Sequence, residues 1–262
     1  MPIVLQKIFE FAFFPKYEDD IKFLEENLAD KEPWDFSDSS ERKHSILRNY
    51  LEYYFRRLQE EMKVKFTKTN EYAAFNTGLV TSNQEAIFCF FEKNRATKPD
   101  SSPYYFKYFM KISDARLLSH FGNELPETAN FFEKPELLIL NPKYKIVPDI
   151  EHIIMDNKDR FPIHLQQADN SEMRRQVHGA IEDVTKKVRT NYKIAIPQYY
   201  GGKIQLLLPL CLTSGSTNPD LALVIDKVTG QDIYSARTCL TLKMAYNNAR
   251  LIVKPQSDWL QP

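Results

Sequence analysis

Hydrophobic residues recur at a helical period in the first quarter of the chain. Between about residues 41 and 62 they stand three and four positions apart and form one wide stripe: Ile46, Leu47, Tyr50, Leu51, Tyr54, Phe55, Leu58 and Met62. Such a stripe predicts an amphipathic helix that covers a sheet. We expect Ser39 or Ser40 to cap this helix, because a serine oxygen accepts hydrogen bonds from the first turn. A shorter helix is predicted over residues 17–29.

The pattern changes after residue 63 to short runs rich in aromatic and β-branched residues. Four runs follow one another, at residues 64–67, 72–76, 85–91 and 104–111. Turn-forming residues separate them, and consecutive short strands with short links are typical of an antiparallel meander.

Helical patterns then return, and a second group of strands follows them. Helices are predicted at 114–119, 149–160 and 172–190, strands at 193–200, 203–212, 221–227 and 233–240, and a final helix at 242–252. Gly201 and Gly202 predict a tight hairpin between the first two of these strands. Pro197 predicts an edge strand or a bulge, because proline cannot donate to a strand ladder.

These elements predict an α+β fold in one compact domain over residues 1–262. It has four regions: a helical N-terminal region (1–63), a first strand group (64–112), a helical middle (113–190), and a second strand group with the final helix (191–262). No internal repeat is visible in the sequence.

The amino-acid composition narrows the range of possible ligands, partners and cellular locations. The 262 residues carry 35 basic and 35 acidic side chains, so the whole chain is not an electrostatic binder of nucleic acid, although a local basic face is compatible with this balance. No run of about twenty apolar residues occurs, so we expect no membrane partner. Cys89, Cys211 and Cys239 are isolated and form neither a metal-ligand spacing nor a disulfide framework. Such cysteines favour a cytoplasmic protein.

Five blocks carry a resemblance to a known family. They are Ile-Leu-Arg-Asn-Tyr at 46–50, Ala-Phe-Asn-Thr-Gly-Leu at 74–79, residues 191–200, residues 204–210 and residues 236–250. They occur in one order over nearly the whole chain, which resembles a bacterial family catalogued as domain of unknown function 3825. The family name implies no activity. Similar domains sit beside RNA-associated modules, and this resemblance adds some weight to an RNA or nucleotide ligand.

The segment 236–250 holds the leading candidate site residues: Arg237, Tyr246, Asn247, Asn248 and Arg250. Asparagine is a poor helix former, so two adjacent asparagines in an apolar-periodic run indicate a functional site. Lys243, Asn247 and Arg250 share one helical stripe, and we expect Arg237 to converge with it on an anionic ligand. The alternative is a structural network that ties the last helix to the sheet.

Two further groups extend the candidate ligand site. Gln198 and Tyr199 end one strand and could read a base or sugar, and Arg189 ends the long helix. The alternative for this strand is an ordinary hairpin with polar cross-strand pairs. Asn76 and Thr77 precede Gly78 and could present short polar groups to a ligand, or form a plain turn.

Signals for catalysis are weak. The sequence lacks a phosphate-binding glycine loop, a dinucleotide fingerprint and a nucleophile elbow. The acidic side chains Asp149, Glu151, Asp156 and Asp159 are interleaved with basic ones and indicate a solvated helix, so no metal site is predicted. Catalytic residues, cofactor and oligomeric state are not predicted, and there is no DNA-specific signal.

The favoured function is therefore a domain that binds a nucleotide or an RNA end, with metal-independent processing of that ligand as its enzymatic form. Two alternatives stay open. One is a non-catalytic interaction module with a structural Arg/Asn/Tyr network, and the other is an enzyme acting on a small non-nucleotide anion.

Overall fold

The computed structural model describes residues 4–32, 34, 43–96, 98, 101–122, 124–216, 218–255 and 259–260. Contacts within the chain divide it into two compact units, Met1–Asn130 and Phe131–Pro262, which we call unit 1 and unit 2. Each unit has its own sheet, its own helices and its own apolar core. The α+β class predicted from the sequence is confirmed.

Unit 1 is built on a five-stranded sheet. Its helices are α1 (Ile8–Phe11), α2 (Tyr17–Phe23), α3 (Ser45–Glu60) and α4 (Ala115–Phe121), and a π-helical turn (Leu24–Leu28) prolongs α2. Its strands are β1 (Ala12–Phe13), β2 (Lys65–Phe66), β3 (Tyr72–Val80), β4 (Ala86–Lys93) and β5 (Tyr104–Lys111). The strand order is β1-β5-β4-β3-β2. Strands β2 to β5 form the predicted antiparallel meander, and β1 pairs with β5 in parallel.

Unit 2 is built on a second five-stranded sheet. Its α-helices are α5 (Ile150–Asn157), α6 (Ile163–Gln166), α7 (Asn170–Thr190) and α8 (Leu242–Arg250), and 3-10 turns lie at Pro135–Leu137, Lys158–Arg160 and Tyr192–Ile194. Its strands are β6 (Lys145–Pro148), β7 (Ile196–Tyr200), β8 (Lys203–Leu210), β9 (Leu221–Lys227) and β10 (Ile233–Leu240). The order is β6-β10-β9-β8-β7, with β6 parallel to β10 and all other pairs antiparallel.

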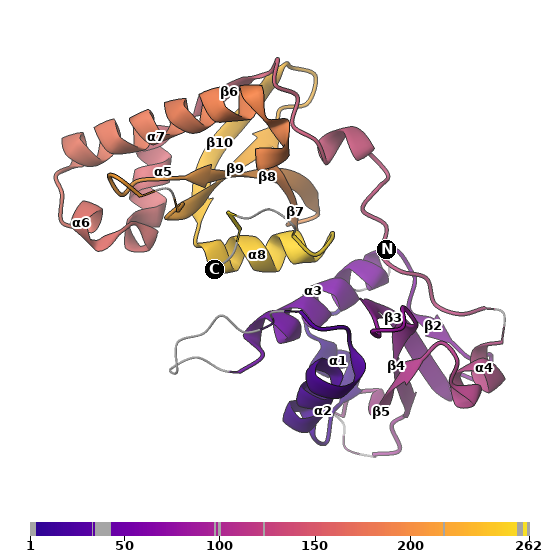
Figure 1. The fold of residues 1–262 in the computed structure, drawn as a ribbon. Coiled ribbons are helices and arrows are strands. Elements are labelled where there is room, and N and C mark those ends of the chain that lie inside the picture. The colour runs from indigo at the N-terminus through magenta and orange to yellow at the C-terminus, as the bar shows by residue number, and fades with distance from the viewer. Residues whose placement is uncertain are drawn as a thin grey trace. The chain divides into compact units, whose positions relative to one another are not determined.

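The two units share one topology, although no repeat is visible in the sequence. In each, the first strand is short and is followed by helices, then by a four-stranded antiparallel meander and a final helix (Figure 1). In each, the first strand pairs in parallel with the last strand of the meander, at the edge of the sheet. Two units can share a topology without similar sequences, because many sets of side chains can fill equivalent core positions.

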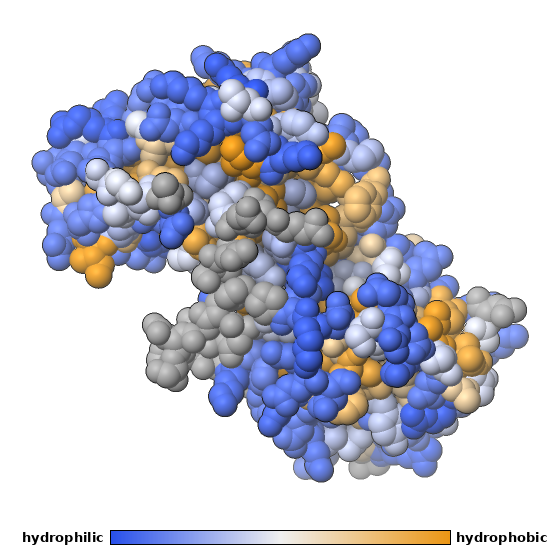
Figure 2. Space-filling view, in the orientation of Figure 1, coloured by the Kyte–Doolittle hydropathy of each residue, from blue (hydrophilic) through white to orange (hydrophobic). Residues whose placement is uncertain are grey.

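Helices cover both faces of each sheet. In unit 1 the predicted stripe of α3 is buried, and its Phe55 packs on Phe75 of β3 with ring centroids 5.2 Å apart. Leu117 and Phe121 of α4 pack in a second cluster with Phe88 and Phe90 of β4. In unit 2, α5 and α7 lie on one face of the sheet and α8 on the other (Figure 1). The outer face of α7 is hydrophilic (Figure 2).

Local signals explain most element boundaries. Asp169 caps α7 by accepting hydrogen bonds from the backbone N–H groups of Ser171 and Glu172, at 2.8 and 2.9 Å, and these bonds lower the pKa of its carboxyl. Gly201 and Gly202 both have positive φ, as the tight turn between β7 and β8 requires. Pro197 lies on an edge strand, as predicted.

Several predicted boundaries need correction. The parallel edge strands β1 and β6 were not predicted, so neither the N-terminal region (1–63) nor the middle region (113–190) is purely helical. Both strands are too short to show an alternating pattern. Strand β7 starts at Ile196, because residues 192–194 form a 3-10 turn instead. The predicted caps Ser39 and Ser40 lie outside the described residues, and the helix after them is described from Ser45.

Candidate functional site

A β-bulge in the last strand of unit 2 isolates Arg237. In the ladder between β9 and β10, Ile225 faces Ala236 and the next residue, Val224, faces Thr238. Arg237 therefore has no partner in the register. Bulges bend a strand and re-aim a side chain, and they are common beside functional sites.

Arg237 projects into an open groove of about 650 Å³ beside the edge strand β6. Its side chain is 68% exposed. The groove is lined by residues of β6, α5, α7 and β10, among them Asp149, Glu151, Arg174, His178, Ser235 and Arg237. It therefore joins two guanidinium groups, an imidazole, a hydroxyl and two carboxylates.

Asp149 holds Arg237 only loosely. Its Oδ1 accepts from the backbone N–H of His152 at 3.2 Å, at the start of α5, and its own N–H donates to the carbonyl of Ala236 at 2.9 Å. The remaining oxygen, Oδ2, lies 3.7 Å from the Arg237 guanidinium. Exposed ion pairs of this kind contribute about 0–1 kcal/mol. A ligand with better geometry can therefore replace Asp149 as the partner of Arg237.

A buried polar network supports the bulge from α5. Asn157 is 1% exposed, and its Oδ1 accepts from Thr238 Oγ1 at 2.9 Å and from Arg160 at 2.7 Å. Arg160 also donates to the carbonyl of Cys239 at 2.6 Å. These bonds fix the two residues that follow Arg237. Asn157 and Arg160 were not predicted from the sequence, although an asparagine on the apolar face of a predicted helix was the available signal.

Gln198 and Asn248 belong to a separate chain of amides. Asn248 Nδ2 donates to Gln198 Oε1, and Gln198 Nε2 donates to Gln205 Oε1, both at 3.1 Å. Gln198 is 1% exposed, so its hydrogen bonds satisfy a buried polar group, as structural networks do. Two strands separate β7 from β10, which corresponds to roughly 14 Å. The structure thus brings Gln198 and Asn248 together, but in a different set of contacts from Arg237.

The other candidates of the last helix are largely covered. Tyr246 and Arg250 are buried, and Asn247 is half-buried with an Oδ1 that has no hydrogen-bond partner among the described residues. Tyr199 packs edge-on against Phe131, with ring centroids 5.1 Å apart. Arg189 is exposed at the end of α7 and does not line the Arg237 groove.

Asn76 and Thr77 lie in unit 1 and stabilise an irregularity of β3. Asn76 Oδ1 accepts from the N–H of Gly78 at 2.9 Å, and Thr77 Oγ1 donates to the carbonyl of Ile87 at 2.7 Å. Tyr50 donates to the carbonyl of Thr77 at 2.8 Å. Thr77 is fully buried. Both side chains are therefore engaged within unit 1, which favours the structural interpretation for them.

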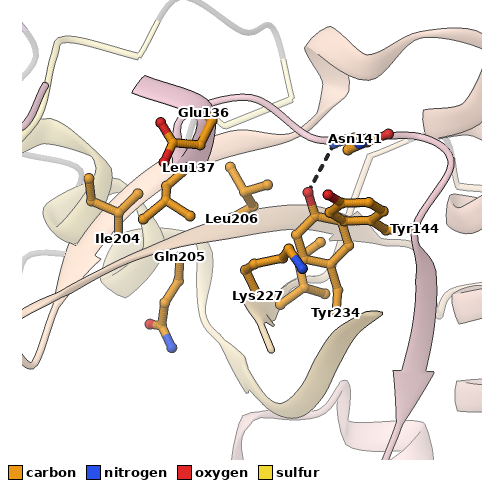
Figure 3. A pocket seen from close by; sticks show the side chains of 10 residues that line it. Glu136, Leu137, Asn141, Tyr144, Ile204, Gln205, Leu206, Lys227 and Tyr234 are labelled. Atoms are coloured by element: carbon orange, nitrogen blue, oxygen red, sulfur yellow. Dashed lines mark hydrogen bonds between the residues drawn. The ribbon is translucent and has the colours of Figure 1, made fainter. Parts of the chain in front are cut away.

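A smaller pocket of about 110 Å³ lies in unit 2 over β8, β9 and β10 (Figure 3). Some of its polar groups are already engaged: the N–H of Asn141 donates to Tyr234 Oη at 2.9 Å, and Lys227 Nζ lies 4.2 Å from the centre of the Tyr144 ring. Gln205 points away from it, toward the opposite face of the sheet (Figure 3). Ligand pockets usually exceed about 300 Å³, so this one is too small for a nucleotide.

Comparison with known proteins identifies the family of this chain. Residues 25–259 match the model of a family described as "Domain of unknown function (DUF3825)". The chain belongs to this DUF3825 family. No curated protein and no solved structure matches it.

The DUF3825 match contains both the Arg237 groove and the network that supports it, because unit 2 falls almost entirely within the matched residues. Over the described residues of this DUF3825 chain, no group of three or more His, Cys, Asp or Glu side chains is placed to hold a metal ion. None of its described helices is both long and apolar enough to cross a membrane.

Proposed function

We propose that the groove beside β6 binds the phosphate end of a nucleotide or of an RNA strand. Arg237 and Arg174 would hold the phosphate, and the carboxylates of Asp149 and Glu151 would accept hydrogen bonds from ribose hydroxyls. The observation that carries the proposal is the bulge, which presents Arg237 as an exposed guanidinium in a groove of about 650 Å³. Ligand sites of about 300–1,000 Å³ hold molecules of nucleotide size.

The charges of the groove support this ligand class. Within the described residues Arg174 and His178 make no ion pair, and Arg237 makes only the loose one with Asp149. Guanidinium groups bind phosphate oxygens in pairs of parallel hydrogen bonds, which Lys cannot do. Carboxylates next to guanidinium groups would weaken binding of a simple anion, but they complement a ligand that carries hydroxyls beside its phosphate. The mixed groove therefore favours a nucleotide over an inorganic anion.

The three free cysteines fit a reducing compartment, and we propose a cytoplasmic location. Two of the thiols, Cys89 and Cys239, are buried, and burial raises the pKa of both. They are packing groups of the two sheets and take no part in the proposed site.

The test is ligand affinity, measured by calorimetry with the full chain. Ligands would be nucleoside mono-, di- and triphosphates, a nucleoside, and short RNAs with and without a terminal phosphate. We expect Arg237→Ala and Arg174→Ala to weaken binding about 10-fold to 100-fold, because each removes a charge-assisted hydrogen bond. Arg237→Lys should be intermediate, because it keeps the charge and loses the planar fork.

The control is Arg175→Ala. Arg175 follows Arg174 on the same exposed turn of α7 but does not line the groove, so its loss should leave affinity unchanged. Equal binding by the wild type, Arg237→Ala and Arg174→Ala would refute the site. Preference for organic acids that lack a base and sugar would support the alternative of a small non-nucleotide anion.

A further inference from the structure

Unit 1 contains a second groove, of about 610 Å³, which the proposed function does not use. It lies between the turn that joins β2 to β3 and the end of α4. Four of the residues that line it carry the argument: Lys65, Lys68, Tyr72 and His120. The groove thus combines cationic and aromatic side chains on one open surface.

The lysines of this groove are uncompensated. Lys63, Arg95 and Lys107, also in unit 1, each face a carboxylate within 4 Å. Among the described residues, Lys65 and Lys68 face none. Glu124 lines the same groove without an ion pair to either lysine in the described portion of the chain. A local excess of positive charge therefore persists on a protein whose formal net charge is zero.

The aromatic groups lie beside these lysines and are partly open to solvent. Phe66 is not one of them, because it follows Lys65 on the edge strand β2 and its ring packs on the opposite face of the sheet, against Phe11 and Tyr104. The exposed His120 ring lies on Tyr72, with centroids 4.0 Å apart, and Tyr72 in turn stacks on Phe90 at 5.5 Å. A column of three rings thus ends at the groove.

We propose that this groove binds single-stranded nucleic acid, with Lys65 and Lys68 on the phosphates and His120, backed by Tyr72, stacking on a base. Proteins that hold single strands combine a positive groove with aromatic stacking surfaces in this way. A duplex keeps its bases stacked on one another and offers no faces to these rings. An acidic peptide would satisfy the lysines but would have no matching group for the rings. The proposal goes beyond the phosphate groove of unit 2 and does not depend on it.

The experiment measures the affinity of the full chain for fluorescent 12-nucleotide RNA, single-stranded DNA and duplex RNA at several salt concentrations. We expect the double substitution Lys65→Glu with Lys68→Glu to weaken single-strand binding at least 10-fold. It should also make the salt dependence shallower by about 1.4 in the log–log slope, which is about 0.7 for each phosphate that the variant no longer neutralises. His120→Ala should weaken binding about 5-fold to 100-fold, the effect of losing one stacked base.

The matched control is Lys134→Glu with Lys143→Glu, which changes the net charge equally at two exposed positions of unit 2. Equal losses in the two double variants would overturn the proposal, because they would show a nonspecific field effect. So would tighter binding of duplex than of single strands, or undetectable binding of any strand by the wild type. Phe66→Leu is the control for His120→Ala, because the Phe66 ring packs on the opposite face of the sheet against Phe11 and Tyr104, and it should leave binding unchanged.

The two proposals fail separately. Arg237→Ala with Arg174→Ala should leave the binding of an unphosphorylated single strand unchanged if this second groove acts alone. Loss of that binding in the arginine variant, with full binding in the lysine variant, would assign the strand to the groove of unit 2 and would refute the present inference.

Discussion

Each unit has a basic residue on a β-bulge in the last strand of its meander, which is β5 in unit 1 and β10 in unit 2. The side chains around this residue differ between the two units. In unit 1 the register between β4 and β5 shifts so that Phe91 faces Phe106 and Phe90 faces Tyr108, which leaves Lys107 without a partner in the ladder. Arg237 is the equivalent residue of β10. The shared topology therefore extends to an irregularity of the backbone.

Packing before the bulge distinguishes the two. In unit 1, Phe106 precedes the bulge and its ring stacks on Phe14, which follows β1, with centroids 4.6 Å apart. In unit 2 the residue before the bulge is Ala236, and its neighbour on β6 is Pro148. Two large rings in unit 1 thus correspond to two small side chains in unit 2.

The ion pairs of the two basic residues also differ, and again the closer contact is in unit 1. Lys107 lies 3.1 Å from Glu92, and this hydrogen bond is the main cause of the raised pKa of Lys107. Arg237 has only its 3.7 Å approach to Asp149. The same kind of bulge is covered by aromatic packing and a close ion pair in unit 1, whereas in unit 2 its basic residue stays exposed. A binding site on this fold is therefore decided by side chains and cannot be inferred from topology alone.

The largest effect should come from breaking the chain inside a unit. A break near Pro162 separates β6 and α5 from the rest of unit 2, whereas a break after Asn130 leaves each sheet with its own helices. We expect the fragment 163–262 to be insoluble or unfolded, and the fragment 1–162 to carry an unfolded remainder of unit 2 beside unit 1, because the core of unit 2 is then divided. Solubility and thermal unfolding followed by circular dichroism measure this. Cooperative melting of both fragments would contradict it, and cooperative melting of 131–262 alone would show that the chain is not one domain.

A single methyl group tests how tightly unit 1 is packed. Gly78 has φ of +72°, and an added Cβ would lie 2.6 Å from Tyr50 Oη and from the Tyr54 ring. Gly78→Ala should therefore lower the free energy of unfolding by about 3 kcal/mol or more, from backbone strain and overpacking together. Gly202→Ala in unit 2 is the control, since φ there is +79° but no atom lies within 4 Å. It should cost about 1–2 kcal/mol. Equal costs in chemical denaturation would show that the Gly78 contact can relax.

The supports of the two bulges can be compared directly. Asn157→Ala leaves the half-buried Thr238 hydroxyl without its acceptor and removes one of the two acceptors of Arg160, so we expect a loss of about 1–3 kcal/mol. Glu92→Gln, at the bulge of unit 1, removes two partly exposed ion pairs, with Lys107 and Arg95, and should cost about 1 kcal/mol or less. Urea denaturation of both variants measures the difference. A larger cost for Glu92→Gln would reverse the assignment of the rigid support to unit 2.

Alkaline pH gives a gradual effect, which is small for each pH unit and specific to the buried thiols. Burial raises the pKa of the Cys239 thiol to about 12 from an ordinary value of 9.0, and it raises that of Cys89 in unit 1 as well. The unfolded state then loses these protons first, so the stability they contribute is complete below pH 9 and declines as the pH rises toward 12. Each thiol should lower the free energy of unfolding by about 1.4 kcal/mol per pH unit in that range. Cys239→Ala should make the decline shallower, and an unchanged slope would show that the thiol ionises in the folded state.

The strands with strong local signals could be predicted from the sequence to the residue. The predicted runs 104–111, 221–227 and 233–240 coincide with β5, β9 and β10, because each combines several large apolar residues with clear turns at both ends. The first strands β1 and β6 could not be found, since they form only through distant parallel partners. The local pattern of hydrophobic residues carries no information about partners that are distant in the sequence.

The candidate site was predicted only incompletely, for a similar reason. Arg237 was named from the sequence, but its neighbours Arg174 and His178 come from a helix some sixty residues earlier in the chain. Gln198 and Asn248 were also named, and the structure shows that they hydrogen-bond to each other. A polar residue inside an apolar pattern indicates that something contacts it. Whether that partner is a ligand or another side chain depends on the tertiary structure.

The parallel edge strands also set an order of events during synthesis. Lys145 of β6 leaves the ribosome several seconds before its partner Ile233, at typical rates of about 5–20 residues per second. Meanwhile β7 to β10 can pair one after another, because each neighbour follows closely along the chain. We therefore expect the strand of each unit that is synthesised first to pair last. Its pairing with the finished meander then completes the edge of the sheet beside the bulge.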